Sequence, residues 1–196
     1  MKLFKKLAVS SLVLTSVNAM ASTEVESIAT WKATAVKDTT SALVVTPLDS
    51  LSFDYAAGVG NGGAFNTQKG MFDVTLEGDT SATDFRLTAE KVTGTLSHLS
   101  HNSTLEVDVI WAGESLSNSH RVTIVDTMSG VHNALNLASL GSAFNLAGRT
   151  SAQESFTFAI NGGMLDGLNP IDGDYSLLPD GIWSGDVKVR FIAEWQ

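Results

Sequence analysis

The sequence predicts an all-β protein, a β-sandwich of short antiparallel strands. Apolar residues alternate with polar ones at a period of two in many segments, and each segment is bounded by Gly, Asp, Asn or Ser. The segments also follow one another at fairly even spacing along a chain of single-domain length. Because successive side chains of a strand point to opposite faces, each segment has one face for a core and one for solvent.

The first 21 residues have the pattern of a secretory signal peptide. Three lysines precede a short apolar run, and AMA at 19–21 places small residues, Ala19 and Ala21, at both cleavage positions. We expect residues 1–21 to be removed. The mature chain would then begin at Ser22, and losing the three lysines lowers the net charge from −9 to −12. An acidic surface repels phosphate backbones, so nucleic acid is not expected as a partner.

Residues 24–36, EVESIATWKATAV, alternate small apolar residues with polar ones and predict a long half-buried strand. The inward positions are Val25, Ser27, Ala29, Trp31, Ala33 and Ala35. Trp31 would fix the register, because a slip of one residue turns it to solvent. The pattern fits a first strand of its own sandwich and equally a strand that completes another domain. Spacing does not decide between them.

Seven further segments alternate in the same way. Their inward residues are Leu51, Phe53 and Tyr55; Phe72, Val74 and Leu76; Phe85, Leu87 and Ala89; Leu105, Val107, Val109 and Trp111; Val122 and Ile124; Phe156, Phe158 and Ile160; and Val187, Val189, Phe191, Ala193 and Trp195. Residues 130–148 fit neither period, and we expect a short helical turn or a long loop there.

Several motifs suggest chemistry but have a plainer interpretation. GVGNGG at 58–63 matches the dinucleotide fingerprint, but a loop and a strand follow it instead of a helix, so a glycine-rich connection is expected. Asp172, Asp174 and Asp180 lack the register of a calcium loop. His98 and His101 lack further ligands at metal-site spacing and are expected in a solvated loop.

The sequence predicts no catalytic, cofactor-binding or metal-binding residues, and hence no enzyme. It has no cysteine and no G-x-S-x-G nucleophile elbow. Trp111 and Trp183 are expected to anchor the core or a turn, and not to form a platform for sugar rings.

Four stretches carry a resemblance to a known family. They are ATWKATAVKDTTSALVVTPLDSLSF at 29–53, FNTQKGMFDVTLEGD at 65–79, RTSAQESFTFAI at 149–160 and LPDGIWSGDVKVRFIAEW at 178–195. These stretches resemble the major fimbrillins of the Escherichia coli common pilus, the Mat or Ecp type. The likeness covers nearly the whole chain and is weaker over 94–148.

The resemblance implies an incomplete immunoglobulin-like pilin domain, residues 37–196, completed by donor-strand exchange. The donor strand would be the extension 22–36 of another copy. Its inward positions would be Val25, Ser27, Ala29, Trp31, Ala33 and Ala35. The candidates for a wall of the acceptor groove are Val187, Val189, Phe191, Ala193 and Trp195.

The resemblance also implies a biological setting. It is a fimbria on the cell surface, exported through the periplasm, that supports host-cell adhesion and early biofilm formation. The implied partners are other copies of the chain, a periplasmic chaperone, an outer-membrane usher, a tip adhesin subunit and a host-cell surface receptor. Two alternatives stay open: a self-complete secreted sandwich that binds carbohydrate, and a secreted hydrolase.

Overall fold

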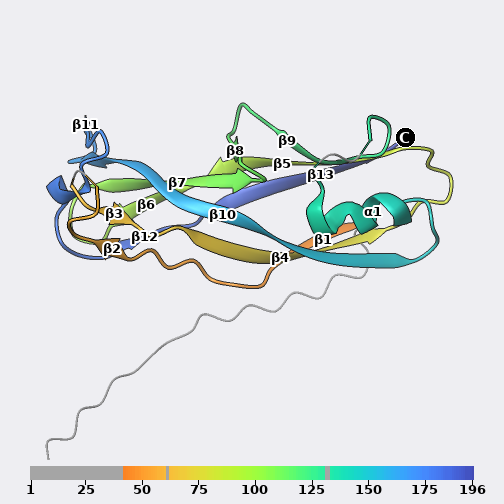
Figure 1. Cartoon of the computed structure of the whole chain (residues 1–196), viewed down its shortest axis with the longest axis horizontal. Coiled ribbons are helices and arrows are strands. Elements are labelled where there is room, and N and C mark those ends of the chain that lie inside the picture. The colour runs from red at the N-terminus through yellow and green to blue at the C-terminus, as the bar shows by residue number, and fades with distance from the viewer. Residues whose placement is uncertain (1–41, 61, 131–132) are drawn as a thin grey trace, which may run out of the picture. The chain divides into compact units, whose positions relative to one another are not determined.

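The structure, a computed structural model, describes residues 42–60, 62–130 and 133–196 (Figure 1). These described residues all belong to one compact unit. The predicted signal peptide and the predicted donor extension, residues 1–36, lie outside the described residues. Among the residues that are described, no helix is long and apolar enough to cross a membrane.

The described strands form two main antiparallel sheets, which confirms the predicted all-β sandwich (Figure 1). The larger sheet has the order β1 (Leu43–Pro47), β4 (Gln68–Glu77), β10 (Arg149–Leu165), β7 (Thr104–Trp111), β6 (Thr95–His98) and β12 (Trp183–Ser184), with β8 (Glu114–Leu116) beside β7 and β11 (Asn169–Pro170) beside β10. The smaller sheet has the order β13 (Lys188–Trp195), β5 (Phe85–Thr93) and β9 (Val122–Asp126). A third pair joins β2 (Tyr55–Ala56) to β3 (Ala64–Phe65).

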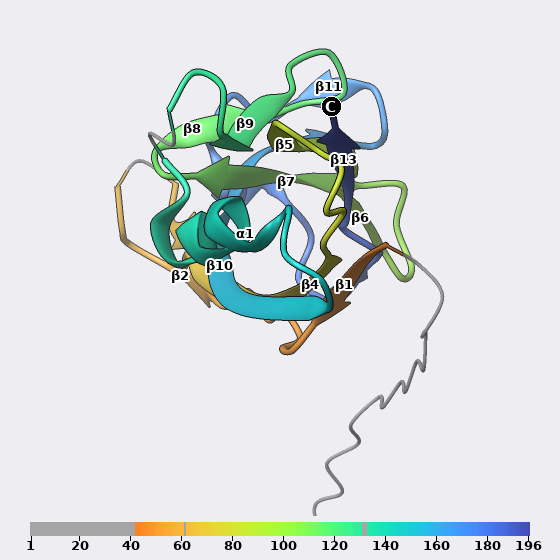
Figure 2. The ribbon, with the colours of Figure 1, turned by 90° about the vertical axis from the view of Figure 1, so that its right-hand side faces the viewer.

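The core lies between the two sheets and consists of the alternating apolar residues. Figure 2 shows β4 and β10 on one side of this core and β5, β9 and β13 on the other. Phe72 of β4 stacks on Phe156 of β10, with ring centroids 4.8 Å apart, and also contacts Phe191 of β13 at 5.3 Å. These three rings join the sheets. Six of the seven alternating segments are therefore confirmed as strands.

The seventh segment, residues 51–55, is wrong as a strand, because only Tyr55 belongs to one. The ladder between β1 and β4 ends just before it. The amide of Leu48 donates to the carbonyl of Met71, but the amide of Met71 then donates to the carboxylate of Asp49. A side chain thus takes the place of the next backbone acceptor and ends the pairing. Leu51 still packs against the core from extended chain.

Residues 130–148 contain a short helical segment, which confirms one of the two expectations for this stretch. It comprises a 3-10 turn η1 (Leu135–Leu137) and the helix α1 (Ala138–Ala143). Leu137 and Leu140 are fully buried, so the segment is held by tertiary packing. It lies at the end of the sandwich where β4 and β13 finish, here called the α1 end (Figure 1).

The opposite end of the sandwich, here called the β2 end, carries the loops that suggested chemistry (Figure 1). GVGNGG joins β2 to β3, as expected for a connection between strands. Gly63 has φ +78° and packs against the ring of Tyr55, so a side chain there would collide with that ring. Asp174 caps the 3-10 turn η2 (Tyr175–Leu177) by accepting the amide of Ser176 at 3.1 Å.

Candidate functional site

Two edge strands on one side of the sandwich have a single partner each. Among the described residues, β1 pairs only with β4 and β13 only with β5. Figure 2 shows β13 above β1 on the same side of the domain, which we call the open side. An edge strand presents a row of unpaired N–H and C=O groups. The open side therefore offers two such rows, one on each sheet.

The inward side chains of β13 are only half-buried. They are Val189, Phe191, Ala193 and Trp195, and Val187 precedes them at the start of the strand. In register, Phe191 lies opposite Ala89 and Ala193 opposite Leu87. Ala89 and Leu87 are completely buried, whereas their partners on β13 are not. The inward side chains are therefore less buried on β13 than on the neighbouring β5, in the direction of the open side.

The same gradient crosses the other sheet. Leu43 and Val45 of β1 lie opposite Leu76 and Val74 of β4. Leu76 and Val74 are 1% and 0% exposed, while Leu43 and Val45 are half-buried and pack against the edge of the core. β1 is the second wall of the open side. Sequence reasoning missed it, although the apolar run LVV before Pro47 was a visible signal.

Trp195 is the last inward residue of β13 and lies at the α1 end of the open side. Its ring contacts Phe85 with centroids 5.3 Å apart. Its indole Nε1 is buried and has no hydrogen-bond partner among the described residues. A buried N–H without an acceptor costs roughly 1–3 kcal/mol. The site therefore contains a donor that a further polar group could satisfy.

The outer face of the smaller sheet carries ion pairs in place of apolar side chains. Glu90 of β5 pairs with Arg190 of β13 at 2.9 Å and with Arg121, before β9, at 3.2 Å. Arg86 pairs with Asp126 at 3.0 Å. Hydrogen bonds from Ser129, together with the Arg86 guanidinium, lower the pKa of Asp126 although burial opposes them. The ion pairs show that this face is directed toward solvent, whereas the inner face of β13 carries apolar side chains along its length.

The sequence-predicted site residues divide into two groups. Val25, Ser27, Ala29, Trp31, Ala33 and Ala35 lie outside the described residues. Val187, Val189, Phe191, Ala193 and Trp195 lie together along the open side, with Val189 to Trp195 on one face of β13 and Val187 just before it. Their placement agrees with a groove wall. Their role as an acceptor stays a prediction.

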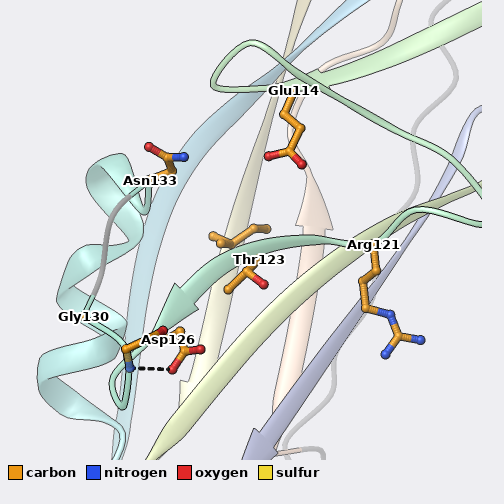
Figure 3. A pocket seen from close by; sticks show the side chains of 8 residues that line it. Glu114, Arg121, Thr123, Asp126, Gly130 and Asn133 are labelled. Carbon is orange, nitrogen blue, oxygen red and sulfur yellow. Dashed lines mark hydrogen bonds between the residues drawn. The ribbon is translucent and has the colours of Figure 1, made fainter.

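A polar pocket of about 310 Å³ lies on another part of the domain (Figure 3). Its charged groups already have partners. Glu114 pairs with His120 at 2.7 Å, Asp126 accepts the amides of Met128 and Ser129, and Arg121 is directed away toward Glu90. No convergent set of free polar groups remains there for chemistry among the described residues. We therefore do not regard this pocket as the functional site.

The expectation of a solvated loop is wrong for His98. His98 ends β6 and is only 7% exposed. Its Nδ1 accepts the amides of Ser100 and His101 at 3.1 and 3.0 Å, and its Nε2 lies 3.2 Å from the carbonyl of Asp180. These bonds tie the loop after β6 to the loop around Asp180 at the β2 end. Within the described chain, no group of three His, Asp or Glu residues is placed to hold a metal ion.

The two tryptophans away from the open side are structural. Trp111 is 1% exposed, and its indole N–H donates to the carbonyl of Asn133 at 2.9 Å. Trp183 packs edge-on against His98, with centroids 4.7 Å apart. The expectation of a core anchor is confirmed for Trp111, while Trp183 is partly buried in a cluster with His98 and Phe65, which agrees with a turn anchor.

Comparison with known proteins adds an identity to this geometry. A family model described as Fimbrillin MatB matches residues 24–195. The common pilus major fimbrillin subunit EcpA of Klebsiella pneumoniae strain 342 is 49% identical over 87% of this chain and 85% of its own length. The EcpA subunit of Escherichia coli strain SMS-3-5 is 47% identical over 92% of this chain and 91% of its own.

A solved structure is also similar, the CooA pilin subunit from enterotoxigenic Escherichia coli. Its TM-score is 0.49 and its sequence identity 21%, over 78% of this chain and 87% of that one. The sequence comparisons alone decide the family. The relatives are structural subunits of pili, and no catalytic family matches among them. The chain belongs to the MatB fimbrillin family.

Proposed function

We propose that this protein is the major structural subunit of a common pilus and that it polymerises by donor-strand exchange. The open side of one copy accepts residues 22–36 of another copy between β1 and β13. The single observation that carries the proposal is the half-buried apolar surface between two unpaired edges. Only an added strand satisfies both its backbone groups and its side chains.

The direction of the incoming strand follows from where the described chain begins. The carbonyl of Ala42 accepts the amide of Glu77, so the chain enters β1 at the α1 end. In a head-to-tail filament the extension of one copy reaches the next copy at its β2 end. From there the extension, followed backward from residue 36 to residue 22, runs toward the α1 end of the next copy. The donor strand is therefore antiparallel to β13, which ends at the α1 end, and parallel to β1.

The same open side explains the partners that assembly needs. An exposed apolar edge with free backbone groups aggregates. A periplasmic chaperone would cover it after residues 1–21 are cleaved as a signal peptide. An outer-membrane usher would then exchange the chaperone for the extension of the next copy. A tip adhesin subunit would end the filament, which lies on the cell surface and supports host-cell adhesion through a surface receptor and early biofilm formation.

Deletion of residues 22–36 tests this proposal. We expect the shortened mature chain to form no filaments by electron microscopy, because no copy can donate a strand. A synthetic peptide of residues 22–36 should bind it and raise its thermal unfolding temperature, and the same peptide with Trp31→Asp should bind at least tenfold more weakly. A full-length mature chain that stays monomeric at high concentration, or a deletion variant that still polymerises, would refute donor-strand exchange.

A further inference from the structure

We infer that Trp31 of the incoming strand sits opposite Ala193 of β13, and that this one pairing sets the register of the polymer. The inference rests on the proposed donor-strand exchange and adds the position at which the strand stops. The occupant is residues 22–36 of a second copy. Inward residues of the two strands must face the same core, so Trp31 can lie opposite Val189, Phe191, Ala193 or Trp195.

Side-chain size favours Ala193. It is the smallest inward residue of β13 and lies between two large aromatic residues, Phe191 and Trp195. The donor has the reverse pattern, because Trp31 lies between Ala29 and Ala33. With Trp31 opposite Ala193, each large side chain meets a small one across the pair. Close packing of this kind is what protein interiors require.

On the facing sheet, the β1 residue at the same distance along the groove as Ala193 is also small. Phe191 contacts Phe72, and Pro47 of β1 lies opposite Phe72 in register. Two residues further toward the α1 end on each strand come Ala193 and, on β1, Val45. A strand between β1 and β13 therefore meets the smaller pair, Ala193 and Val45, at the level of Trp31. The indole lies where the two facing wall residues are together smaller than the pairs on either side, Phe191 with Pro47 and Trp195 with Leu43.

The charges on the outer face exclude two other registers. With Trp31 opposite Val189, Lys32 would face Lys188 directly. With Trp31 opposite Phe191, Lys32 would face Arg190. Like charges directly opposite each other destabilise a sheet. With Trp31 opposite Ala193, Lys32 faces Ile192 and Thr30 faces Glu194, so no like charges meet.

The remaining register puts Trp31 directly opposite Trp195 and carries most of the donor past the end of β13. The Ala193 register avoids this and also provides for the indole N–H of Trp195, which has no acceptor within residues 42–60, 62–130 and 133–196. Ser27 is the only inward donor residue with a polar side chain. In the Ala193 register it is the diagonal neighbour of Trp195, within reach of a long aromatic side chain. Its hydroxyl can accept that N–H.

Disulfide trapping in the full mature chain tests the register, because the chain has no cysteine of its own. The test variant carries Thr30→Cys and Glu194→Cys, both on the solvent face. Directly opposite residues have Cα atoms about 4.5–5.5 Å apart, whereas a shift of two residues places them beyond the roughly 7 Å limit of a disulfide. We expect a ladder of linked subunits on a non-reducing gel after polymerisation.

Three matched controls keep Glu194→Cys and move the donor cysteine to Glu26, Ile28 or Lys32. These report the Val189, Phe191 and Trp195 registers in that order. A ladder from one of them instead of Thr30→Cys overturns the register while leaving donor-strand exchange intact. Filaments without a ladder from any variant also overturn it, because the donor would not lie beside β13. A mature chain that forms no filaments at all refutes the proposed function itself.

A size exchange provides a second readout that does not depend on disulfide chemistry. Ala193→Phe should reduce filament yield at least tenfold, because it fills the place of Trp31. Adding Trp31→Ala to the same chain should restore most of the yield. Val189→Phe is the matched control, and its loss should not be rescued by Trp31→Ala. Equal rescue of both would overturn the assignment of Ala193.

Discussion

Strands β9 and β13 are both edges of the smaller sheet, and both pair with β5, yet only one of them is covered. The inward residues of β9 are Val122, Ile124 and Val125, and all are 2% exposed or less. None of the inward residues of β13 is fully buried. In both strands apolar residues occupy alternate positions, and in β9 a register shift against β5 also buries Val125 next to Ile124. The strand pattern therefore does not explain the difference.

The difference lies in what each edge packs against. α1 and β8 both contact β9, and Leu140 of α1 is completely buried. Phe144, just after α1, stacks on Phe85 of β5 at 5.9 Å. Within residues 42–60, 62–130 and 133–196, nothing plays this part beside β13. The domain therefore covers one edge of the smaller sheet with its own helix, and the described residues leave the other edge half-exposed.

Leu140→Ala removes a side chain of α1 that helps to cover the β9 edge, here called the closed side. It should have the largest effect on the free energy of unfolding. Removal of a fully buried leucine leaves a cavity and costs about 2–5 kcal/mol. We expect this loss in the free energy of unfolding, measured by urea denaturation of the deletion variant in complex with peptide 22–36. Ser139→Ala, on the exposed side of α1, is the matched control and should cost under about 0.5 kcal/mol. A cost below about 1 kcal/mol for Leu140→Ala would show that α1 does not close this edge.

Phe191→Ala tests the half-buried β13 edge and should cost less free energy of unfolding than Leu140→Ala. A fully buried phenylalanine costs about 3–5 kcal/mol on truncation, and a half-buried one roughly half of that. We expect about 1.5–2.5 kcal/mol in the deletion variant without peptide. The cost should increase when the peptide is bound, since the added strand buries the ring. An equal cost with and without peptide would contradict the idea that the open side closes on strand addition.

Lowering the pH should have the smallest effect on stability, and it acts on the closed side through Asp126 at the end of β9. Its pKa is lowered in the folded protein, mainly by hydrogen bonds from Ser129 and also by Arg86. The resulting stability is present above the unfolded pKa of about 3.9 and is lost as the pH falls through the lower folded value. Asp126→Asn should be less stable than the parent at pH 7, and the gap should narrow near pH 2. Parallel curves across this range would contradict the role of Asp126.

The five longest strands and β9 could be predicted from local pattern. Alternation places Val107, Val109 and Trp111 on one face, and the structure buries all three. The stretch 51–55 alternates equally well, but Asp49 captures the amide that would continue the ladder. His98 has no local signal of burial, because the groups that bind it include the carbonyl of Asp180, which is distant in the sequence. Such contacts exist only after the loops meet.

The sequence by itself determined the all-β class, the inward faces of most strands and, through long stretches of resemblance, the fimbrillin family. Through that resemblance it also marked β13 as a candidate wall. Tertiary structure decided which edge stays open, that β1 forms the second wall, and that Ala193 stands at the level of Val45. The physical reason is that alternation reports only which way a side chain points. Whether anything covers it depends on elements that are distant in the chain and meet only in the fold.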